Sequence, residues 1–280
     1  MTRPARVRLQ PDNKTTLRVD GRSLAGIFVA VCGRSCGDGR VIMFSPALEK
    51  QRQQLYADTT QGMAQRLRSV SGPVEMLAAV GWGLQKLEQT YTETPAKELA
   101  KVACCAGCGI CCSVPVDVQA HEVFYTAEFI QLNFSPADLA GVIERTAARR
   151  ASVAGLDEEA RSRLMQPCSL LRDGSCTVYA GRPEICRAHH SNNAEICTAH
   201  VADPDVDPSP DYIPVLRARM FAVMLGMDAA IEAAGYDDRA YDFGSALHEA
   251  LTNSLCRVRW LQRKRAFPES CLAFPHPAGD

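Results

Sequence analysis

The chain has 280 residues, with 31 basic against 32 acidic side chains, 46% hydrophobic residues and 13 cysteines. This charge balance excludes a general electrostatic attraction to nucleic acid or to an anionic membrane surface. The longest apolar run, Leu24 to Cys32, has nine residues, whereas a membrane helix needs about 18. We therefore expect a globular protein with neither a signal peptide nor a membrane span.

The N-terminal part of the chain predicts a small β element followed by two helices. Alternating apolar residues between Arg6 and Val31 indicate a hairpin. Ser45-Pro46 predicts a helix start, because a serine side chain can cap the helix and proline suits its first turn, and this helix should run to about Val70. A second helix should follow Pro73. Its apolar face consists of Leu77, Val80, Leu84, Leu87 and Tyr91.

Two further helices are predicted after the cysteine-rich part. The segment from Val201 to Pro214 contains four prolines and four aspartates, so it favours a linker over a helix or strand. Two apolar stripes at helical spacing follow it. The first comprises Leu216, Met220, Met224, Met227 and Ile231, whose methionines we expect in the core. The second comprises Phe243, Leu247, Leu251, Leu255 and Val258.

These elements predict a mainly α fold, with helical flanks around a loop-rich cysteine core and a small N-terminal β element. The predicted organisation begins with a β-containing element (1–45), a helical segment (46–100) and a cysteine-cluster region (101–200). A Pro/Asp-rich linker (201–214), a C-terminal helical segment (215–266) and a tail (267–280) follow.

The cysteines are concentrated in one part of the chain. Nine of the 13 fall between Cys104 and Cys197, and five of these lie in the nine residues from Cys104 to Cys112. Their number is odd and too low for a disulfide scaffold. Without a secretory signal, this pattern indicates a reducing cytoplasm in which thiolates bind metal.

The segment Cys104-Cys105-Ala-Gly-Cys108-Gly-Ile-Cys111-Cys112 predicts a metal loop. Two thiolates separated by two residues can face one ion across a tight turn, and glycines allow the backbone conformation that such a turn requires. The opening matches the bacterial ferredoxin pattern, but the fourth cysteine of that pattern would fall at Pro115, so the chain is no ferredoxin. Because Cys111 and Cys112 are adjacent, they indicate either two metal centres or one ligand beside one packed thiol.

A fourth ligand must come from elsewhere, and a second set of cysteines can supply it. Its members are spaced by eight, ten and eleven residues and lie near turns or helix boundaries: Cys168, Cys176, Cys186 and Cys197. A single isolated cysteine could be a small buried apolar residue, but four of them behind a five-cysteine loop favour metal binding.

Together these motifs resemble the YkgJ-like zinc- or iron-chelating cysteine-cluster proteins, a region also found in flagellin lysine methylases. The resemblance depends on Cys105-x2-Cys108-x2-Cys111-Cys112, on Pro167-Cys-Ser-Leu-Leu171, and on the run from Cys176 to Arg187. It implies eight metal ligands: Cys105, Cys108, Cys111, Cys112, Cys168, Cys176, Cys186 and Cys197. Cys104 is a ninth thiol beside the motif, which leaves the register of the first ligand open.

Other side chains could support or replace these ligands. A four-thiolate centre is negatively charged, so nearby cations should stabilise it, and Arg172, Arg182 and Arg187 are placed for this, unless they are ordinary solvated arginines. Histidines could take the place of a cysteine, but the surplus of thiolates favours cysteine-only ligation. These histidines are His189, His190 and His200.

The remaining features favour ordinary structural roles. Asp117 is predicted to cap a helix that carries His121-Glu122, which is interpreted as a surface pair because it lacks the second histidine of a zinc protease. Cys32 and Cys36 form an additional thiol pair that we do not expect to bind metal. A basic helix end surrounds Trp260 and complements the helix dipole. Near the C-terminus, Cys256 is expected to be packed and Cys271 is expected to be free.

The sequence predicts a metal site without predicting a reaction, because no phosphate-binding loop, dinucleotide fingerprint or nucleophile elbow occurs in it. Cysteine-only ligation and nearby arginines favour an iron–sulfur centre, [4Fe–4S] in type, over zinc. The favoured function is an accessory or redox metalloprotein. The alternatives are an enzyme like the flagellin lysine methylases and a structural zinc scaffold for a protein partner.

Overall fold

The computed structural model describes residues 18–19, 22–23 and 44–274. The chain divides into two units, residues 1–43 and 44–280. In the first unit, β1 (Arg18–Val19) pairs antiparallel with β2 (Arg22–Ser23), inside the predicted N-terminal β element. The rest of that predicted element, including Cys32 and Cys36, lies outside the described residues.

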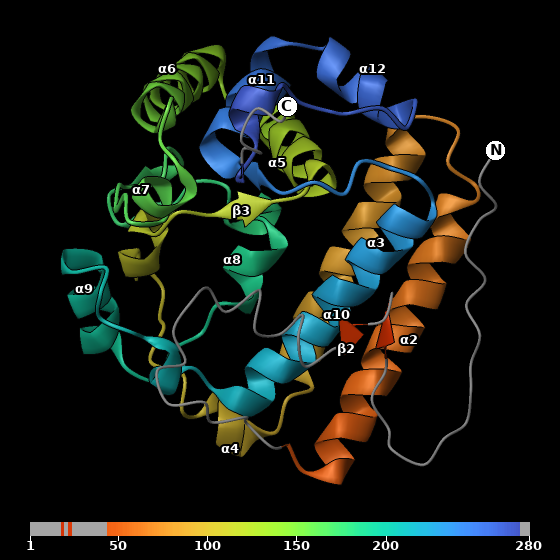
Figure 1. Ribbon diagram of the computed structural model, residues 1–280, viewed down its shortest axis with the longest axis vertical. Coiled ribbons are helices and arrows are strands. Elements are labelled where there is room, and N and C mark those ends of the chain that lie inside the picture. Colours follow the sequence, from red (N-terminus) through yellow and green to blue (C-terminus); the bar gives the residue numbers. More distant parts are fainter. Residues whose placement is uncertain (1–17, 20–21, 24–43, 275–280) are drawn as a thin grey trace. The chain divides into compact units, whose positions relative to one another are not determined.

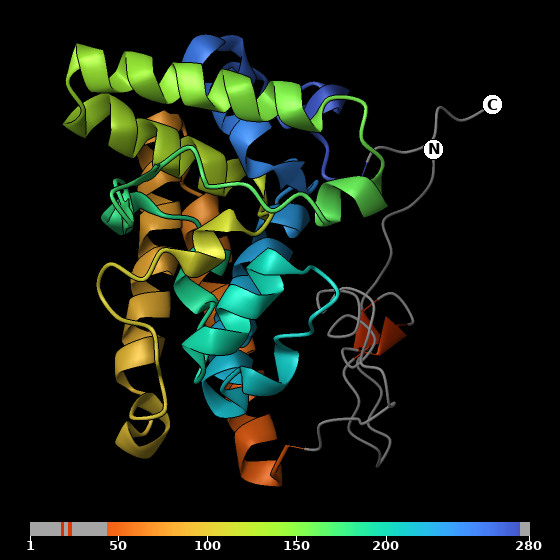
Figure 2. The same cartoon turned by 90° about the vertical axis from the view of Figure 1, so that its left-hand side faces the viewer.

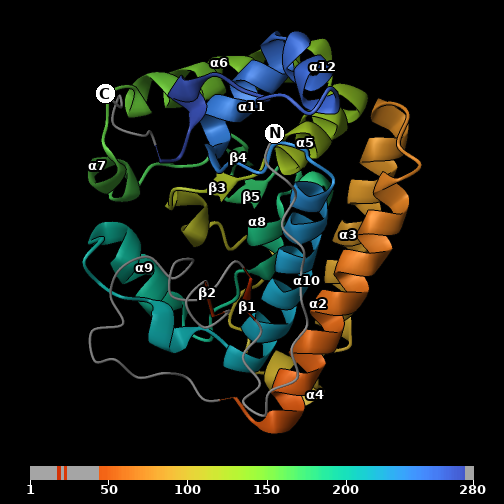
Figure 3. The same ribbon diagram turned by 45° about the vertical axis from the view of Figure 1, so that its right-hand side comes forward.

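Three long helices of the second unit pack side by side: α2 (Pro46–Leu67), α3 (Pro73–Thr92) and α10 (Pro214–Ala233) (Figure 1, Figure 3). Each begins with a proline, and the Leu48 N–H donates a hydrogen bond to the Ser45 hydroxyl at 3.3 Å, which confirms the predicted cap. A Cβ on Gly226 of α10 would lie 2.8 Å from the Tyr56 carbonyl oxygen of α2. The glycine thus permits close contact between these helices.

The predicted apolar faces of α3 and α10 point largely into the core. Val80, Leu84 and Leu87 are buried, as are Met220 and Met227. Three other members of these faces are only half-buried: Leu77, Tyr91 and Met224. Burial of this much apolar surface is the main stabilising contribution to the three-helix layer.

A second layer consists of α5 (Ala120–Asn133), α6 (Pro136–Val153) and α11 (Phe243–Thr252), followed in sequence by α12 (Leu255–Leu261). Figure 2 shows α5 and α6 running across the upper ends of the long helices. The Phe124 ring centroid lies 5.1 Å from those of Trp260 and Phe267, so aromatic packing joins α5 to the C-terminal segment.

The single helix predicted from Phe243 to Val258 is wrong, because the chain breaks between α11 and α12. The Asn253 side chain accepts a hydrogen bond from the Leu255 N–H at 3.2 Å, and this local bond competes with the helical pattern. After the break, Leu255 is 61% exposed and Val258 is 47% exposed. Cys256 and Trp260 face the core instead.

The remaining elements are short and surround the cysteine-rich part. The helices are α4 (Ala96–Leu99), α7 (Glu158–Ser162), α8 (Glu184–Ala188) and α9 (Ala194–Ala202), with 3₁₀ turns η1 (Ile110–Ser113), η2 (Tyr179–Gly181), η3 (Ser209–Asp211) and η4 (Glu269–Cys271). The antiparallel strand pairs are β3 (Asp117–Val118) with β6 (Tyr241–Asp242), and β4 (Leu171–Arg172) with β5 (Ser175–Cys176).

The predictions for the start of α5 are wrong in two respects. Gln119, not Asp117, is the N-cap residue of the helix. The Glu122 carboxylate accepts a hydrogen bond from the Gln119 N–H at 2.7 Å, as in a capping box. Asp117 instead lies in β3 and accepts from Arg161 at 2.7 Å. His121 is 0% exposed and Glu122 is 7% exposed, so they are no surface pair.

The C-terminal segment is packed against the core over a longer stretch than its proline content predicts. Cys256 is packed as predicted, and Cys271, although free of a disulfide, is also fully buried. Beyond the end of α12, the Arg263 guanidinium donates to the Ala234 carbonyl at 2.9 Å, so the basic helix end binds main-chain oxygens. Within residues 44–274, no helix combines the length and apolar character needed to cross a bilayer.

Candidate metal centre

The two loops that carry most of the cysteines lie against each other. The Cys168 N–H donates a hydrogen bond to the Cys112 carbonyl at 2.8 Å, and Gln166 donates similarly to Ser113 at 2.9 Å. A Cβ on Gly109 would lie 2.9 Å from the Gly174 carbonyl oxygen, so only glycine fits there without a shift. Main-chain contacts therefore bring together thiols that are 56 residues apart in sequence.

Tight turns fix the backbone that carries the thiols of each loop. The Cys108 N–H donates to the Cys105 carbonyl at 3.1 Å, and Gly107 completes this turn with a φ of 82°. In the second loop, Asp173 (φ 51°) and Gly174 (φ 73°) form the turn of the β4–β5 hairpin. That hairpin places Cys176 opposite Leu171, near Cys168.

Two short helices bring the last pair of cysteines to the same region. Cys186 lies in α8 and Cys197 in α9, whose N-terminus is capped by the Asn193 side chain at 3.0 Å from the Glu195 N–H. Helix α9 packs against the η1 turn, which contains the adjacent cysteines of the first loop. The Ser191 carbonyl connects these parts by accepting the Ala103 N–H at 2.9 Å.

The cysteines of this region remain accessible. None of the nine residues involved, all of which the structure describes, is buried: seven are half-buried, while Cys105 and Cys186 are exposed. By contrast, Cys256 and Cys271 are both 0% exposed. A free cysteine that serves only packing is among the most buried residues. The accessible thiols are therefore available as ligands.

Four of the accessible thiols form a first thiol group, defined as Cys112, Cys168, Cys176 and Cys186. Burial raises the pKa of Cys168 to about 11, and the thiols of Cys112 and Cys176 raise it further. Protein atoms also desolvate Cys186, although this residue is exposed, and raise its pKa well above the ordinary value, with the three other members contributing. Because electrostatic interactions weaken with distance, these mutual effects indicate that the four thiols are neighbours.

Other thiols form a second group beside the first, defined as Cys104, Cys108, Cys111 and Cys197. Burial raises the pKa of Cys104, and the thiols of Cys108 and Cys197 raise it further. The Cys104 thiol also points to the Ser191 carbonyl, at 3.9 Å. The raised pKa of Cys111 reflects a hydrogen bond with Cys112 and burial, followed by the charges of Cys112, Cys186 and Cys104. This thiol therefore lies at the boundary between the two groups, and we count it with the second.

The adjacent cysteines 111 and 112 connect the two groups. The hydrogen bond from Cys111 lowers the pKa of Cys112 to about 7, and the charge of Arg182 lowers it too. Cys105, the first ligand implied by the family resemblance, is exposed and belongs to neither group. The adjacent Cys104 is half-buried and is the one that we count in the second group.

Arginines surround the first thiol group. Arg182 and Arg187 both lower the pKa of Cys176, although burial raises it overall. Arg187 is held by an ion pair with Glu88 at 2.6 Å. Arg172, by contrast, is half-exposed and pairs with Asp138 at 3.3 Å on the surface, which directs its charge away from the thiols.

Arg149 is a further cation that sequence reasoning missed. It lies on α6, and its positive charge lowers the pKa of Cys168. Hydrogen bonds to Gln166 and Asp242, both 3.2 Å long, hold its guanidinium in place. No sequence motif identifies it, because α6 approaches the cysteines only through the tertiary fold.

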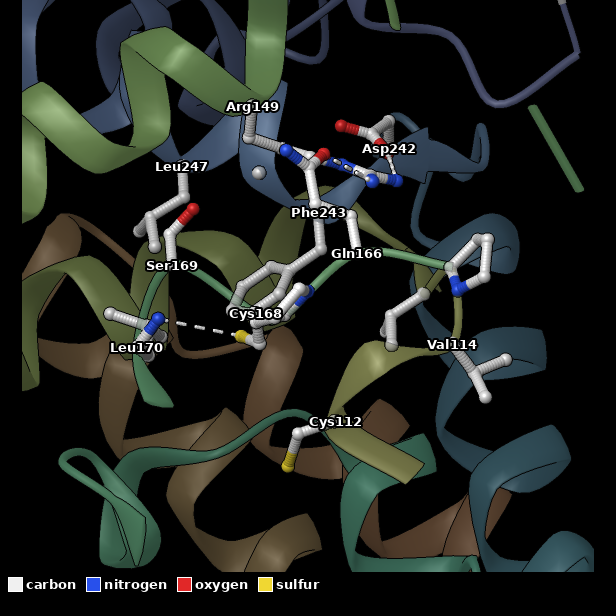
Figure 4. Close-up of a pocket in the computed structure, with 14 residues that line it drawn as sticks. Cys112, Val114, Arg149, Gln166, Cys168, Ser169, Leu170, Asp242, Phe243 and Leu247 are labelled. Carbon is white, nitrogen blue, oxygen red and sulfur yellow. Dashed lines mark hydrogen bonds and ion pairs between the residues drawn. The ribbon is translucent and has the colours of Figure 1, made fainter. Parts of the chain in front are cut away.

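A small cavity adjoins the first thiol group (Figure 4). Cys112, Cys168 and Arg149 contribute to its lining, and its volume is about 30 Å³. Such a volume holds one or two water molecules.

The three histidines considered as alternative ligands have other partners. His189 lies edge-on to Tyr212 with ring centroids 5.1 Å apart, and His190 stacks on Tyr91 at 5.0 Å. His200 forms a 2.7 Å hydrogen bond with the Val206 carbonyl. These contacts orient the imidazoles independently of the thiols.

The fold and the clustered thiols define a mainly helical protein with a cysteine cluster suited to chelating metal. Residues 104–203 match the CxxCxxCC family, whose description is "Putative zinc- or iron-chelating domain". The match covers both cysteine loops together with α8 and α9. Comparisons with curated proteins and with solved structures found no match.

Proposed function

We propose that this protein is an iron–sulfur protein with an accessory or redox role, and that each of its two thiol groups binds one [4Fe–4S] cluster. The observation that carries this proposal is that both cysteine loops, α8 and α9 bring accessible thiols together, and we assign eight of these thiols to two sets of four. A [4Fe–4S] cluster takes four cysteine thiolates, so each set contains the required number of ligands.

The two candidate centres place different demands on the thiols. Thiolates bound to one zinc ion lie at most about 4.6 Å apart, twice the Zn–S bond of about 2.3 Å, whereas an iron–sulfide core occupies the space between its thiolate ligands and holds them further apart. We favour clusters because the region supplies nine accessible thiols, more than a single four-ligand zinc site needs.

The charges near the first thiol group support a redox role. A cluster with four thiolates is anionic, and cations around it stabilise the reduced state and raise the reduction potential. Arg149, Arg182 and Arg187 supply positive charge close to these thiols, and their ion pairs with Asp242 and Glu88 offset part of it.

Anaerobic purification from iron-replete cells, followed by iron, zinc and acid-labile sulfide analysis, tests this function. We expect a brown protein with about eight iron and eight sulfide per chain, and an electron paramagnetic resonance signal on reduction. A colourless protein with stoichiometric zinc and no sulfide would contradict the proposal and support a structural zinc site.

Serine substitutions test the assignment to two groups. Because a hydroxyl is a poor ligand for a thiophilic metal, Cys186→Ser and Cys108→Ser should each remove about half of the iron. Cys256→Ser and Cys271→Ser are matched controls outside both groups and should retain all of it. Full iron content in both ligand variants would show that these cysteines are not ligands.

A further inference from the structure

A cluster of one histidine and two carboxylates lies outside the thiol groups, with His121 and Glu184 buried and Asp228 half-buried. His121 comes from the first turn of α5, Glu184 is the first residue of α8, and Asp228 lies on α10. One ligand atom of each residue lies within 4.8 Å of those of the other two. In Figure 3, α8 lies beside α10 and below α5, as this convergence requires.

We propose that His121, Glu184 and Asp228 bind a divalent metal ion of the manganese or iron(II) class, separate from the cysteine-ligated centres. Imidazole and carboxylate ligands are those that such ions accept, whereas thiophilic metals prefer the cysteines. The three residues leave further coordination positions for water.

The distances fit one ion after a small adjustment. His121 Nε2 lies 2.7 Å from Glu184 Oε1. Metal bonds to nitrogen and oxygen are about 2.0–2.2 Å long, so two ligands of one ion lie at most about 4.4 Å apart. Moving the side chains by a few tenths of an ångström would therefore complete the site.

The hydrogen bonding of the histidine also suits a ligand. His121 is 0% exposed, and its Nδ1 has no hydrogen-bond partner in the part of the chain that the structure describes. A buried polar atom without a partner is uncommon in a folded protein, and a bound ion at the cluster would account for it if this nitrogen supplies the lone pair.

Acidic groups outnumber the arginines that reach this cluster. No described residue donates a hydrogen bond to the Asp228 carboxylate, and burial together with the charge of Glu184 raises its pKa well above the ordinary value. Glu122 adds a third acidic group, whose oxygens accept main-chain N–H groups of Gln119 and Glu184 at 2.7 and 2.8 Å. Arg187 faces Glu184 but is already paired with Glu88. A divalent cation bound to the ionised carboxylates would offset the repulsion between them.

Manganese(II) is the probe of choice because it prefers oxygen ligands and leaves thiolates free. Full-length protein with its cysteine centres loaded is titrated with MnCl₂, and free Mn²⁺ is followed by electron paramagnetic resonance. We expect one bound Mn²⁺ per chain and at least tenfold weaker binding in Asp228→Asn. Asp238→Asn is the matched control, because Asp238 is exposed and lies outside the cluster although its charge reaches Asp228.

Circular dichroism and iron content, measured on the same samples, show whether each variant is folded and retains its cysteine centres. His121→Gln is a second ligand variant and should show the same loss. The proposal is wrong if the wild-type chain binds no Mn²⁺, or if folded Asp228→Asn binds it as tightly as the wild type. Because Mn²⁺ binding and iron content are measured separately, failure of this site is distinguishable from failure of the iron–sulfur centres.

Discussion

Cysteines occupy two different environments in this protein. Cys256 and Cys271 are fully buried and behave as small apolar residues, whereas the thiols of both groups lie on turns and short helices where metal can reach them. The surroundings of a thiol, rather than its position in a motif, therefore decide whether it can serve as a ligand. Cys104 and Cys105 show this most clearly, because they are adjacent but differently placed.

Serine substitution at these two positions is the sharpest test at the residue scale. Cys104→Ser should remove the metal of the second thiol group, because Cys108 and Cys197 neighbour the Cys104 thiol. Cys105→Ser should leave the metal content unchanged, because Cys105 is a member of neither group as we assign them. The measurement is metal per chain for both variants. The opposite pattern would restore Cys105 as the ligand that the family resemblance implies.

A second residue-scale prediction concerns His189. Burial and the charge of Arg217 lower its pKa to about 4 from 6.5, so the folded protein keeps this imidazole neutral. The unfolded chain takes up a proton first, and stability should therefore fall as the pH drops from 6.5 towards 4. Between pH 7.5 and 5.5, we expect the titration of His189 to lower the free energy of unfolding by roughly 1 kcal/mol.

His189→Phe keeps a ring beside Tyr212 and removes this titration. Urea unfolding at both pH values should show a smaller acid loss in the variant than in the wild type. Equal losses in the two proteins would mean that His189 is protonated equally in the folded and unfolded states.

At the scale of the elements, glycine sets how closely the long helices approach. In an exposed helix, replacing glycine by alanine stabilises by about 1 kcal/mol. On Gly226, however, a Cβ would lie 2.8 Å from the Tyr56 carbonyl oxygen and 2.9 Å from the Thr59 Cβ. Backbone atoms cannot move aside as the end of a flexible side chain can.

Gly226→Ala should therefore destabilise the protein by about 1–3 kcal/mol, because α10 must shift away from α2. Gly141→Ala on α6 is the matched control, since the nearest atom there is the Arg145 Nη1 at 3.2 Å, at the end of a flexible side chain. This control should be neutral or slightly stabilising. Thermal unfolding of both variants measures the difference, and equal midpoints would show that the α2–α10 contact tolerates a methyl group.

At the scale of the whole molecule, the cysteine loops and the helices differ in what holds them together. Helices α5 and α6 lie between the two cysteine loops in sequence, yet they pack on α11 through buried apolar residues. The loops contain few buried apolar residues and depend on turns and main-chain hydrogen bonds. Metal ligands would supply the missing cross-links between them.

Removal of metal by a chelator should therefore loosen the protein unevenly. We expect faster hydrogen exchange in residues 104–112 and 168–176 and in α8 and α9, while α2, α3, α5, α6 and α10 stay protected. Hydrogen exchange followed by mass spectrometry on loaded and chelated protein measures this. Unchanged protection across both loops would show that they pack without metal.

The sequence by itself determined the mainly α fold class, because helical periodicity, capping residues and prolines act over a few neighbouring residues. Pro46 and Pro73 start helices as predicted for this local reason. The clustering of cysteines likewise predicted thiolate chemistry, and residues 104–203 match a zinc- or iron-chelating family.

Only the tertiary structure decided which groups face one another, because ligand geometry and electrostatics depend on distances through space. It separated Cys104 from Cys105, directed Arg172 to the surface and brought Arg149 to Cys168. It also buried His121 beside Glu184, 63 residues further along the chain. These partners come from helices that are distant in sequence, so no local pattern could have identified them.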